Sequence, residues 1–214
     1  MLSILYEDDQ ILAIDKPAGL ATIPERRIEQ QSLLGDLTRL YAYKIYVVHR
    51  LDKEVSGVIL FAKNPAAHRS LNEQFNQRLV KKTYISLVHG LIARENGEIN
   101  MPIRQYGSGR MAVDWQAGKE CLTFYQVQER YKNYTLLNLY PHTGRRHQIR
   151  VHLYNLGHPV VGDLRYGEKN IQKEFPRLML HARKIEFKTM SGEERELESP
   201  QPDLFTSVLA LCKG

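Results

Sequence analysis

The chain has 214 residues, 43% of them hydrophobic, and a formal net charge of +6 at neutral pH. These values exclude a disordered chain and suit a folded protein, either one large domain or two halves that share a cleft. The mild positive charge favours anionic partners. The sequence has no apolar run of eighteen residues, and its N-terminus turns acidic where a secretory signal would be apolar. We therefore expect a soluble, cytoplasmic protein with no membrane partner.

The first half of the chain predicts an N-terminal hairpin, two helices and the strands beside them. Ser32 and the Asn64-Pro65 pair are typical helix starts, and apolar residues follow each of them at helical spacing. The predicted helices cover residues 33–41 and 65–79. Short β-branched or aromatic runs predict strands at 4–6, 10–14, 47–48, 55–61 and 81–90.

The second half predicts further strands and a short helix with a cationic side. Within residues 142–157, Ile149 and Leu153 share an apolar face, Arg146 and Arg150 lie four apart on another face, and Gly157 ends the helix. A loop, a basic stretch to residue 176 and a last apolar helix after Pro202 complete the chain. The predicted strands are 98–103, 121–128, 134–140 and 178–187.

Neither the cysteines nor the histidines predict a metal site or a disulfide. Cys121 and Cys212 are far apart and belong to no Cys-x-x-Cys pair, so we expect two reduced structural thiols. His142, His147 and His152 recur every five residues, which turns each one about 140° further round a helix. Zinc-binding pairs lie four apart on one face. These histidines are therefore either polar helix positions or side chains of a binding surface.

The sequence supports neither a dinucleotide-binding site nor a serine nucleophile. Residues 107–112 match Gly-x-Gly-x-x-Ala, with Glu129 at a suitable distance for a ribose contact, but a strand pattern follows them where a dinucleotide site needs a helix N-terminus. A loop between strands explains these glycines better, and it would let Arg104 and Arg110 contact phosphate. The sequence also has no Gly-x-Ser-x-Gly elbow for a serine nucleophile.

The stretch from Val47 to Phe61 places one carboxylate, Asp52, on a turn between two apolar runs. An isolated aspartate on such a turn is usually a turn former or a helix cap. A catalytic role needs a cationic partner that keeps the carboxylate ionised, and the chain offers Arg50 nearby and the arginine-rich segment around Arg150. With basic strand ends and tyrosines, this set suits a polyanionic substrate that carries planar bases.

Six ordered motifs resemble those of the RluA-type RNA pseudouridine synthases, over about residues 4–200. The motifs are residues 15–19, 49–57, 82–84, 144–152, 162–167 and 180–182. The resemblance implies an α+β fold with a central, mostly antiparallel mixed sheet in two halves, flanking helices and a catalytic cleft. It also implies isomerisation of selected uridines in tRNA, ribosomal RNA or both, with RNA and not DNA as partner, and no cofactor.

The resemblance also assigns roles to individual residues. Asp52 matches the family's nucleophile, Tyr84 its tyrosine beneath the uracil, and Arg150 the arginine that pairs with the aspartate; a direct attack on the sugar and a glycal route both stay open. Arg50 matches the residue that fills the gap left by the flipped base. Further RNA contacts are expected at His49, Lys81, Lys82, Arg145, Arg146 and His147.

Two positions depart from the family pattern, since Val55 replaces a threonine and Arg146 a serine or threonine. We expect residues 1–214 to form a single catalytic domain without the S4-like N-terminal module of many relatives, and to be monomeric. The alternative is a non-catalytic RNA-binding or RNA-folding helper with the same basic cleft. An intact set of Asp52, Tyr84 and Arg150 favours the enzyme, because binding alone needs no nucleophile.

Overall fold

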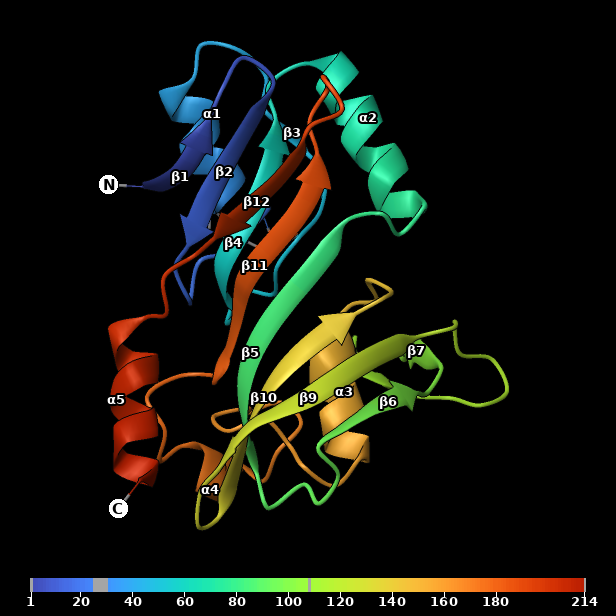
Figure 1. Ribbon diagram of the computed structural model, residues 1–214, viewed down its shortest axis with the longest axis vertical. Coiled ribbons are helices and arrows are strands. Elements are labelled where there is room, and N and C mark those ends of the chain that lie inside the picture. Colours follow the sequence, from blue (N-terminus) through green and yellow to red (C-terminus); the bar gives the residue numbers. More distant parts are fainter. Residues whose placement is uncertain (1, 25–30, 108, 214) are drawn as a thin grey trace. The chain divides into compact units, whose positions relative to one another are not determined.

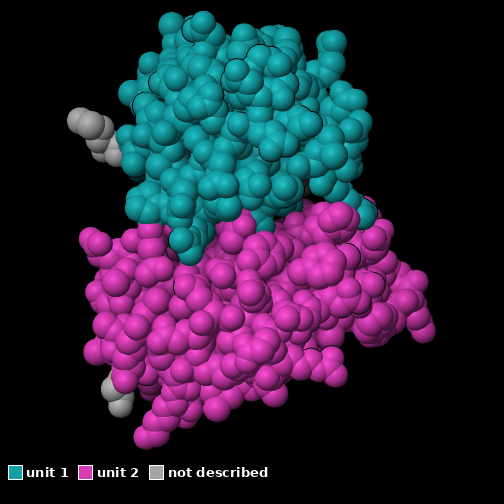
Figure 2. Space-filling model, in the orientation of Figure 1, with its two compact units in different colours: residues 1–82, 182–200 teal, residues 83–181, 201–214 magenta. Residues whose placement is uncertain are grey.

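The computed structural model describes residues 2–24, 31–107 and 109–213 (Figure 1). The chain divides into two compact units, each drawn in its own colour in Figure 2. Unit 1 comprises residues 1–82 and 182–200, and unit 2 comprises residues 83–181 and 201–214. Each unit combines strands with helices, which confirms the predicted α+β class. The extent of the predicted single domain stays a prediction.

Unit 1 is built on a sheet in the order β1-β2-β4-β11, with β3 paired to β4 and β12 paired to β11. The antiparallel hairpin of β1 and β2 confirms the predicted N-terminal hairpin. Every residue of β4 is buried, in agreement with the apolar run from Val58 to Ala62. The strands are β1 (Ser3–Glu7), β2 (Ile11–Lys16), β3 (Tyr46–Val47), β4 (Ser56–Ala62), β11 (Leu180–Lys188) and β12 (Glu194–Glu198).

Two helices of unit 1, α1 (Leu33–Leu40) and α2 (Pro65–Asn76), begin where the sequence predicts. The Ser32 hydroxyl accepts a hydrogen bond from the Gly35 amide at 3.1 Å, and the Asn64 side chain accepts one from the Ala67 amide at 2.9 Å. Each cap satisfies an amide that has no partner within its helix. The buried face of α2 packs on the apolar core of the sheet through Ala67 and Leu71.

Unit 2 contains a second set of strands in the order β5-β10-β9-β6 and a separate two-stranded sheet of β7 and β8. The α3 helix lies against β9 and β10, where its His152 and Gln148 side chains reach the Thr123 hydroxyl at 3.0 and 2.9 Å. The elements are β5 (Lys81–His89), β6 (Asn96–Asn100), β7 (Ile103–Gln105), β8 (Met111–Val113), β9 (Leu122–Arg130), β10 (Tyr134–Pro141), α3 (Gln148–Asn155), α4 (Lys169–Gln172) and α5 (Asp203–Cys212).

The predicted strand at 98–103 is wrong in its continuity. The structure ends β6 at Asn100 and starts β7 at Ile103, and the two strands belong to different sheets. Pro102 between them has no amide to donate to a ladder, so a continuous strand is disfavoured there. The strands β8 and β12 are not predicted from the sequence. Both are short, and the charged sequence of β12 leaves three of its five residues exposed.

The helix predicted within 142–157 is shorter than the motif that contains it. It begins at Gln148, because His147 has a left-handed backbone with φ of 54°. Arg146 therefore precedes the helix, and Arg150 is only 3% exposed, so the predicted cationic side of this helix is wrong. The apolar face with Ile149 and Leu153 is confirmed, and Gly157 follows the helix end with φ of 89°.

Among the residues that the structure describes, no helix has the length and apolar character needed to cross a membrane.

Candidate active site

Asp52 lies in the loop from residue 48 to residue 55, which joins β3 to β4 in unit 1. The loop turns sharply, with the Val55 amide donating to the Asp52 carbonyl at 3.1 Å. On one side of Asp52, the Leu51 amide donates to the Thr22 hydroxyl at 3.2 Å, and that hydroxyl donates to the Leu51 carbonyl at 2.9 Å. The buried Thr22 hydroxyl thus holds both backbone polar groups of Leu51, the residue before Asp52.

The other side of Asp52 is held by Lys16, whose side chain is fully buried. Its ammonium group donates to three backbone carbonyls, those of Pro17 at 2.9 Å, Leu20 at 2.7 Å and Lys53 at 3.2 Å. The segment at residues 15–19 therefore supports the loop that bears Asp52. The sequence indicates this segment only by its resemblance to the family, and that resemblance assigns no role to Lys16. A sequence signal for this role of Lys16 does exist, because Lys16 is the last residue of the largely apolar strand β2.

Replacing Lys16 by methionine is expected to lower the free energy of unfolding by about 3 kcal/mol or more. The thioether keeps the length of the side chain but removes this donor from three carbonyls. The Lys53 carbonyl keeps the Gly19 amide, and loss of the donor costs about 1–3 kcal/mol at each of the other two. Urea denaturation would measure the change. Lys213→Met is the control, because the Lys213 side chain is 59% exposed. Equal stability of the two variants would contradict the supporting role of Lys16.

Gly57 follows the Asp52 loop and cannot carry a side chain in this fold. Its φ is 121°, a conformation that L residues rarely adopt. A Cβ atom at Gly57 would lie 2.1 Å from the carbonyl oxygen of Ala182 in the same unit. Close approach of two backbones therefore explains why this motif contains glycine. Val55, one of the two departures from the family pattern, is buried, with 3% of its surface exposed.

His49 is half-buried and makes its contacts within unit 1, while Arg50 beside it is exposed. The His49 Nε2 atom accepts a hydrogen bond from the Leu60 amide at 3.0 Å, and the ring stacks on Phe75 with centroids 4.8 Å apart. Burial lowers the pKa of His49 to about 3, with a smaller contribution from the positive charge of Lys82, so the ring is neutral at pH 7. The ring supports the loop structurally, and RNA contacts by either residue stay predictions.

Acidification is expected to destabilise the protein through His49. The ring has its ordinary pKa near 6.5 when unfolded and about 3 when folded, so the unfolded state binds more protons between these values. Stability from the neutral ring is complete above about pH 6.5 and falls as the pH drops toward 3. Between about pH 7 and 4, the wild type should lose about 2–3 kcal/mol more than His49→Gln in urea denaturation. Parallel losses in both proteins would contradict this assignment.

Tyr84 and Arg150, the other predicted catalytic residues, both belong to unit 2. Tyr84 is half-buried on β5, opposite Leu139 of β10. The guanidinium group of Arg150 donates from Nε and Nη2 to the two oxygens of Asp163, each at 2.8 Å, and its centre lies 5.3 Å from the Tyr166 ring centroid. A bidentate pair fixes the direction of the guanidinium group. The predicted pairing of Arg150 with Asp52 stays a prediction.

Asp163 holds Arg150 and shapes its own loop at the same time. Its Oδ1 atom also accepts the amides of Arg165 at 3.0 Å and Tyr166 at 3.2 Å. The side chains of Asp163 and Arg150 are 0% and 3% exposed, so the ion pair is buried. Residues 162–167 match a family motif, but the sequence does not predict that Asp163 pairs with Arg150. Sequence spacing carries no signal for it, because the contact depends on how the loop returns to α3.

The remaining predicted RNA contacts differ in exposure. His147 is buried, and its Nδ1 atom lies 2.7 Å from the Tyr166 hydroxyl. Burial lowers the pKa of Lys82 to about 8. Lys81, Arg145 and Arg146 are exposed. Lys81 lies 3.6 Å from Glu186, an exposed pair of the kind that contributes little to stability. RNA binding by these residues stays a prediction.

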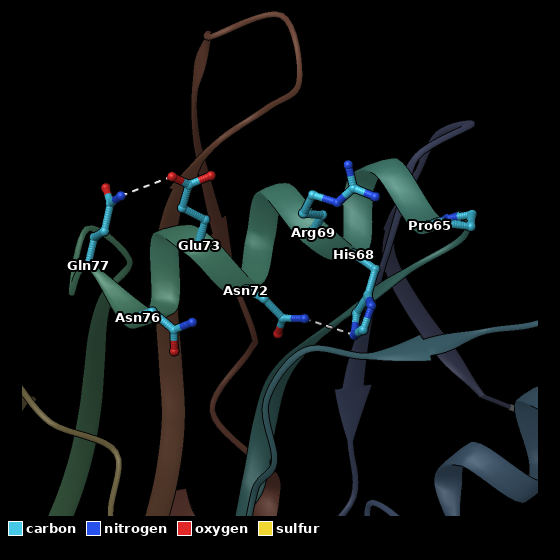
Figure 3. A pocket seen from close by; sticks show the side chains of 7 residues that line it. All are labelled: Pro65, His68, Arg69, Asn72, Glu73, Asn76 and Gln77. Carbon is cyan, nitrogen blue, oxygen red and sulfur yellow. Dashed lines mark hydrogen bonds between the residues drawn. The ribbon is translucent and has the colours of Figure 1, made fainter.

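The described residues hold no metal cluster at these positions, and the pocket along α2 lies apart from them in sequence. Over residues 2–24, 31–107 and 109–213, no three His, Cys, Asp or Glu side chains are placed to hold a metal ion. A shallow pocket lies along α2, where Asn72 and His68 hydrogen-bond at 2.9 Å (Figure 3). One helix supplies its whole lining, which includes none of the predicted site residues. The lining residues are Pro65, His68, Arg69, Asn72, Glu73, Asn76 and Gln77.

The structure is an α+β protein in which hydrogen bonds from Thr22 and Lys16 hold the loop that carries Asp52. A model of the RNA pseudouridylate synthase family matches residues 10–155, and the chain belongs to this family. The dual-specificity RNA pseudouridine synthase RluA of Vibrio cholerae is 39% identical over 188 residues, which cover 87% of this chain and 77% of the relative. The ribosomal large subunit pseudouridine synthase D of Pseudomonas aeruginosa is 38% identical over 234 residues, which cover 99% of this chain and 72% of the relative.

Solved structures agree with this assignment. The structure of human RNA pseudouridylate synthase domain containing 1 has a TM-score of 0.80 and 34% sequence identity. The match covers 94% of this chain and 84% of the human chain. Human RNA pseudouridylate synthase domain containing 4 also has a TM-score of 0.80, at 24% identity, and supports the fold alone. The chain is an RNA pseudouridine synthase, an isomerase, and the catalytic interpretation is favoured over a binding-only helper.

Proposed function

We propose that this enzyme isomerises selected uridines in tRNA, ribosomal RNA or both, with Asp52 as the nucleophile. Tyr84 stacks beneath the uracil, and Arg150 keeps the Asp52 carboxylate ionised. The names of two relatives support RNA as the substrate, since one is called a dual-specificity RNA pseudouridine synthase and the other a ribosomal large subunit pseudouridine synthase. Arg150 suits its role because its guanidinium group is already oriented by Asp163.

The observation that carries the proposal is the restraint on the Asp52 loop. Thr22 holds the residue before Asp52, and Lys16 and the Gly19 amide hold the carbonyl of the residue after it. A nucleophile has to be kept in its reactive geometry, and supporting hydrogen bonds supply that order before the substrate binds. An aspartate that only formed a surface turn would not need support from a buried lysine.

The proposed reaction rearranges the atoms of one nucleotide and needs no oxidant or reductant. The bond between C1′ and N1 of uracil breaks, the base turns while it stays bound, and C5 forms a bond to C1′. C5 then loses its proton to solvent while N1 gains one, so the product is an isomer of the substrate. Asp52 acts either by attack on C1′ or by proton removal that gives a glycal.

RNA binding is assigned to the basic residues that the family motifs contain. Arg50 enters the space of the flipped uridine, whose unstacking costs a few kcal/mol. Phosphate contacts come from Lys81, Lys82, Arg145 and Arg146, with His49 and His147 nearby in sequence. Contacts of this kind release counterions, so binding should weaken steeply with salt. The monomeric state and cytoplasmic location stay predictions.

The test is release of tritium from RNA labelled at uridine C5. The purified protein is incubated with an unmodified tRNA transcript and, separately, with unmodified ribosomal RNA. Release is expected from at least one RNA, and comparison of the two assigns the substrate class. The Asp52→Asn variant is the inactive control. Salt-sensitive binding without release from either RNA would overturn the proposal and favour a binding-only protein.

A further inference from the structure

The hairpin of β7 and β8 in unit 2, whose first strand is labelled in Figure 1, and the turn that follows β8 carry exposed aromatic and cationic side chains. We call Arg104, Tyr106 and Trp115 the hairpin patch. Trp115 is 71% exposed and Tyr106 is 44% exposed. The Arg104 guanidinium lies 5.9 Å from the Tyr106 ring centroid, so the patch combines a flat apolar surface with a positive charge.

The turn that presents Trp115 is rigid. Asp114 Oδ1 accepts the amides of Gln116 at 3.0 Å and Ala117 at 2.9 Å, and the Asp114 carbonyl accepts the Gly118 amide at 2.9 Å. A Cβ atom at Gly118 would lie 2.3 Å from that carbonyl oxygen. The Trp115 ring is therefore held in solvent by an ordered backbone, and a ligand would lose little chain entropy on contacting it.

The same carboxylate ties the patch together. Asp114 Oδ2 lies 3.3 Å from Nη1 of Arg104 and accepts a hydrogen bond from the Tyr106 hydroxyl at 3.2 Å. The Asp114 side chain is only 13% exposed, while that of Arg104 is 53% exposed. The negative charge thus lies beneath the patch, and the positive charge faces solvent.

Further cations flank the hairpin. Arg165 donates to the Gly109 carbonyl at 3.0 Å, and Arg145 donates to the Glu120 carbonyl at 3.2 Å. Arg110 lies over the Tyr166 ring at 5.3 Å, and Lys119 is exposed. The two carboxylates of this segment, Asp114 and Glu120, are outnumbered by cations. This charge balance suits a polyanion better than a protein surface of mixed charge.

The inner face of the hairpin is fixed to the body of unit 2. Ile103 and Met111 pack in one buried cluster with Val151 of α3 and with Tyr166. The Tyr166 hydroxyl also accepts the Met111 amide at 3.3 Å. The hairpin is therefore a fixed arm, and its outward residues are free of core packing.

We propose that the hairpin patch is an RNA contact in which Trp115 stacks on an unpaired base while Arg104 and its flanking cations hold the adjoining phosphates. This inference rests on the proposed function only for its choice of RNA substrate. A base presents a flat π surface to an aromatic ring whatever its identity, so stacking adds affinity without fixing the sequence. The contact would thus help to hold the RNA beyond the reacting uridine.

Intrinsic fluorescence tests the contact directly, because Trp115 is the only tryptophan of the chain. The full-length Asp52→Asn protein is titrated with the unmodified tRNA transcript and with unmodified ribosomal RNA. Stacking should quench the Trp115 emission saturably, and salt should reverse the quenching. Binding detected by filter retention with unchanged Trp115 emission would overturn the inference.

Kinetics of tritium release supply the second measurement. Trp115→Ala should raise KM at least about fivefold, the lower end of the range for loss of one base stack, and Trp115→Phe should restore most of the loss. Arg104→Ala removes the proposed phosphate contact and should also raise KM. Its matched control is Arg39→Ala, because Arg39 is an exposed arginine that also pairs with a nearby aspartate. Equal KM values for Trp115→Ala and the wild type would overturn the inference.

The two measurements separate this inference from the proposed function. Quenching by RNA without tritium release from the wild type would contradict the catalytic proposal and support the contact. Tritium release without quenching, and with no effect of Trp115→Ala on KM, would support the catalytic proposal and overturn the contact.

Discussion

Replacing Asp52 by asparagine is expected to abolish tritium release, with a fall in rate of about 10⁴-fold or more, as for the loss of other enzyme nucleophiles. The amide has almost the same shape as the carboxylate but neither attacks C1′ nor accepts a proton from the sugar. The loop around residue 52 should persist, because Thr22 and Lys16 hold its backbone through Leu51 and Lys53. Single-turnover release from saturating RNA would measure the change in the chemical step.

Two controls make this result specific to the reaction. Urea denaturation should show the Asp52→Asn variant within about 1 kcal/mol of the wild type, as for a substitution without cavity or buried charge. Asp203→Asn, at the exposed start of α5, should leave the rate unchanged. A rate for Asp52→Asn within tenfold of the wild type would exclude Asp52 as the nucleophile.

Replacing Asp163 by alanine is expected to lower the free energy of unfolding by about 3–5 kcal/mol. The substitution removes both hydrogen bonds to the Arg150 guanidinium and leaves that charge buried with 3% exposure. It also removes the acceptor of the Arg165 and Tyr166 amides. Urea denaturation of the variant and the wild type would measure the loss.

A double-mutant cycle isolates the pair from the turn. Arg150→Met should also be destabilising, but the double variant Asp163→Ala/Arg150→Met should lose less than the sum of the single variants, because no buried charge then lacks a partner. Asp163→Asn keeps an acceptor for the two amides and removes the charge. Strict additivity across the cycle would contradict a coupled buried pair.

Local sequence determined those features whose physical cause lies within a few residues. Ser32 and Asn64 cap the amides that follow them, so both helix starts in unit 1 could be predicted. The uninterrupted apolar run of β4 predicted a buried strand. The ordered motifs with Asp52, Tyr84 and Arg150 identified the family, because residue type and order survive in the sequence whatever the fold brings together.

The tertiary structure alone decided which distant groups stabilise those residues. Lys16 reaches the Lys53 carbonyl across 37 positions, and Arg150 pairs with Asp163 in a loop beyond its helix. Spacing along the chain contains no information about such contacts. Helical periodicity predicted a cationic face, whereas the structure shows that Arg150 is buried. The helix begins only after His147, which has a left-handed backbone, and Asp163 offsets the cost of burying the Arg150 charge. A periodic pattern fixes which residues share a face, whereas burial of that face depends on what packs against it.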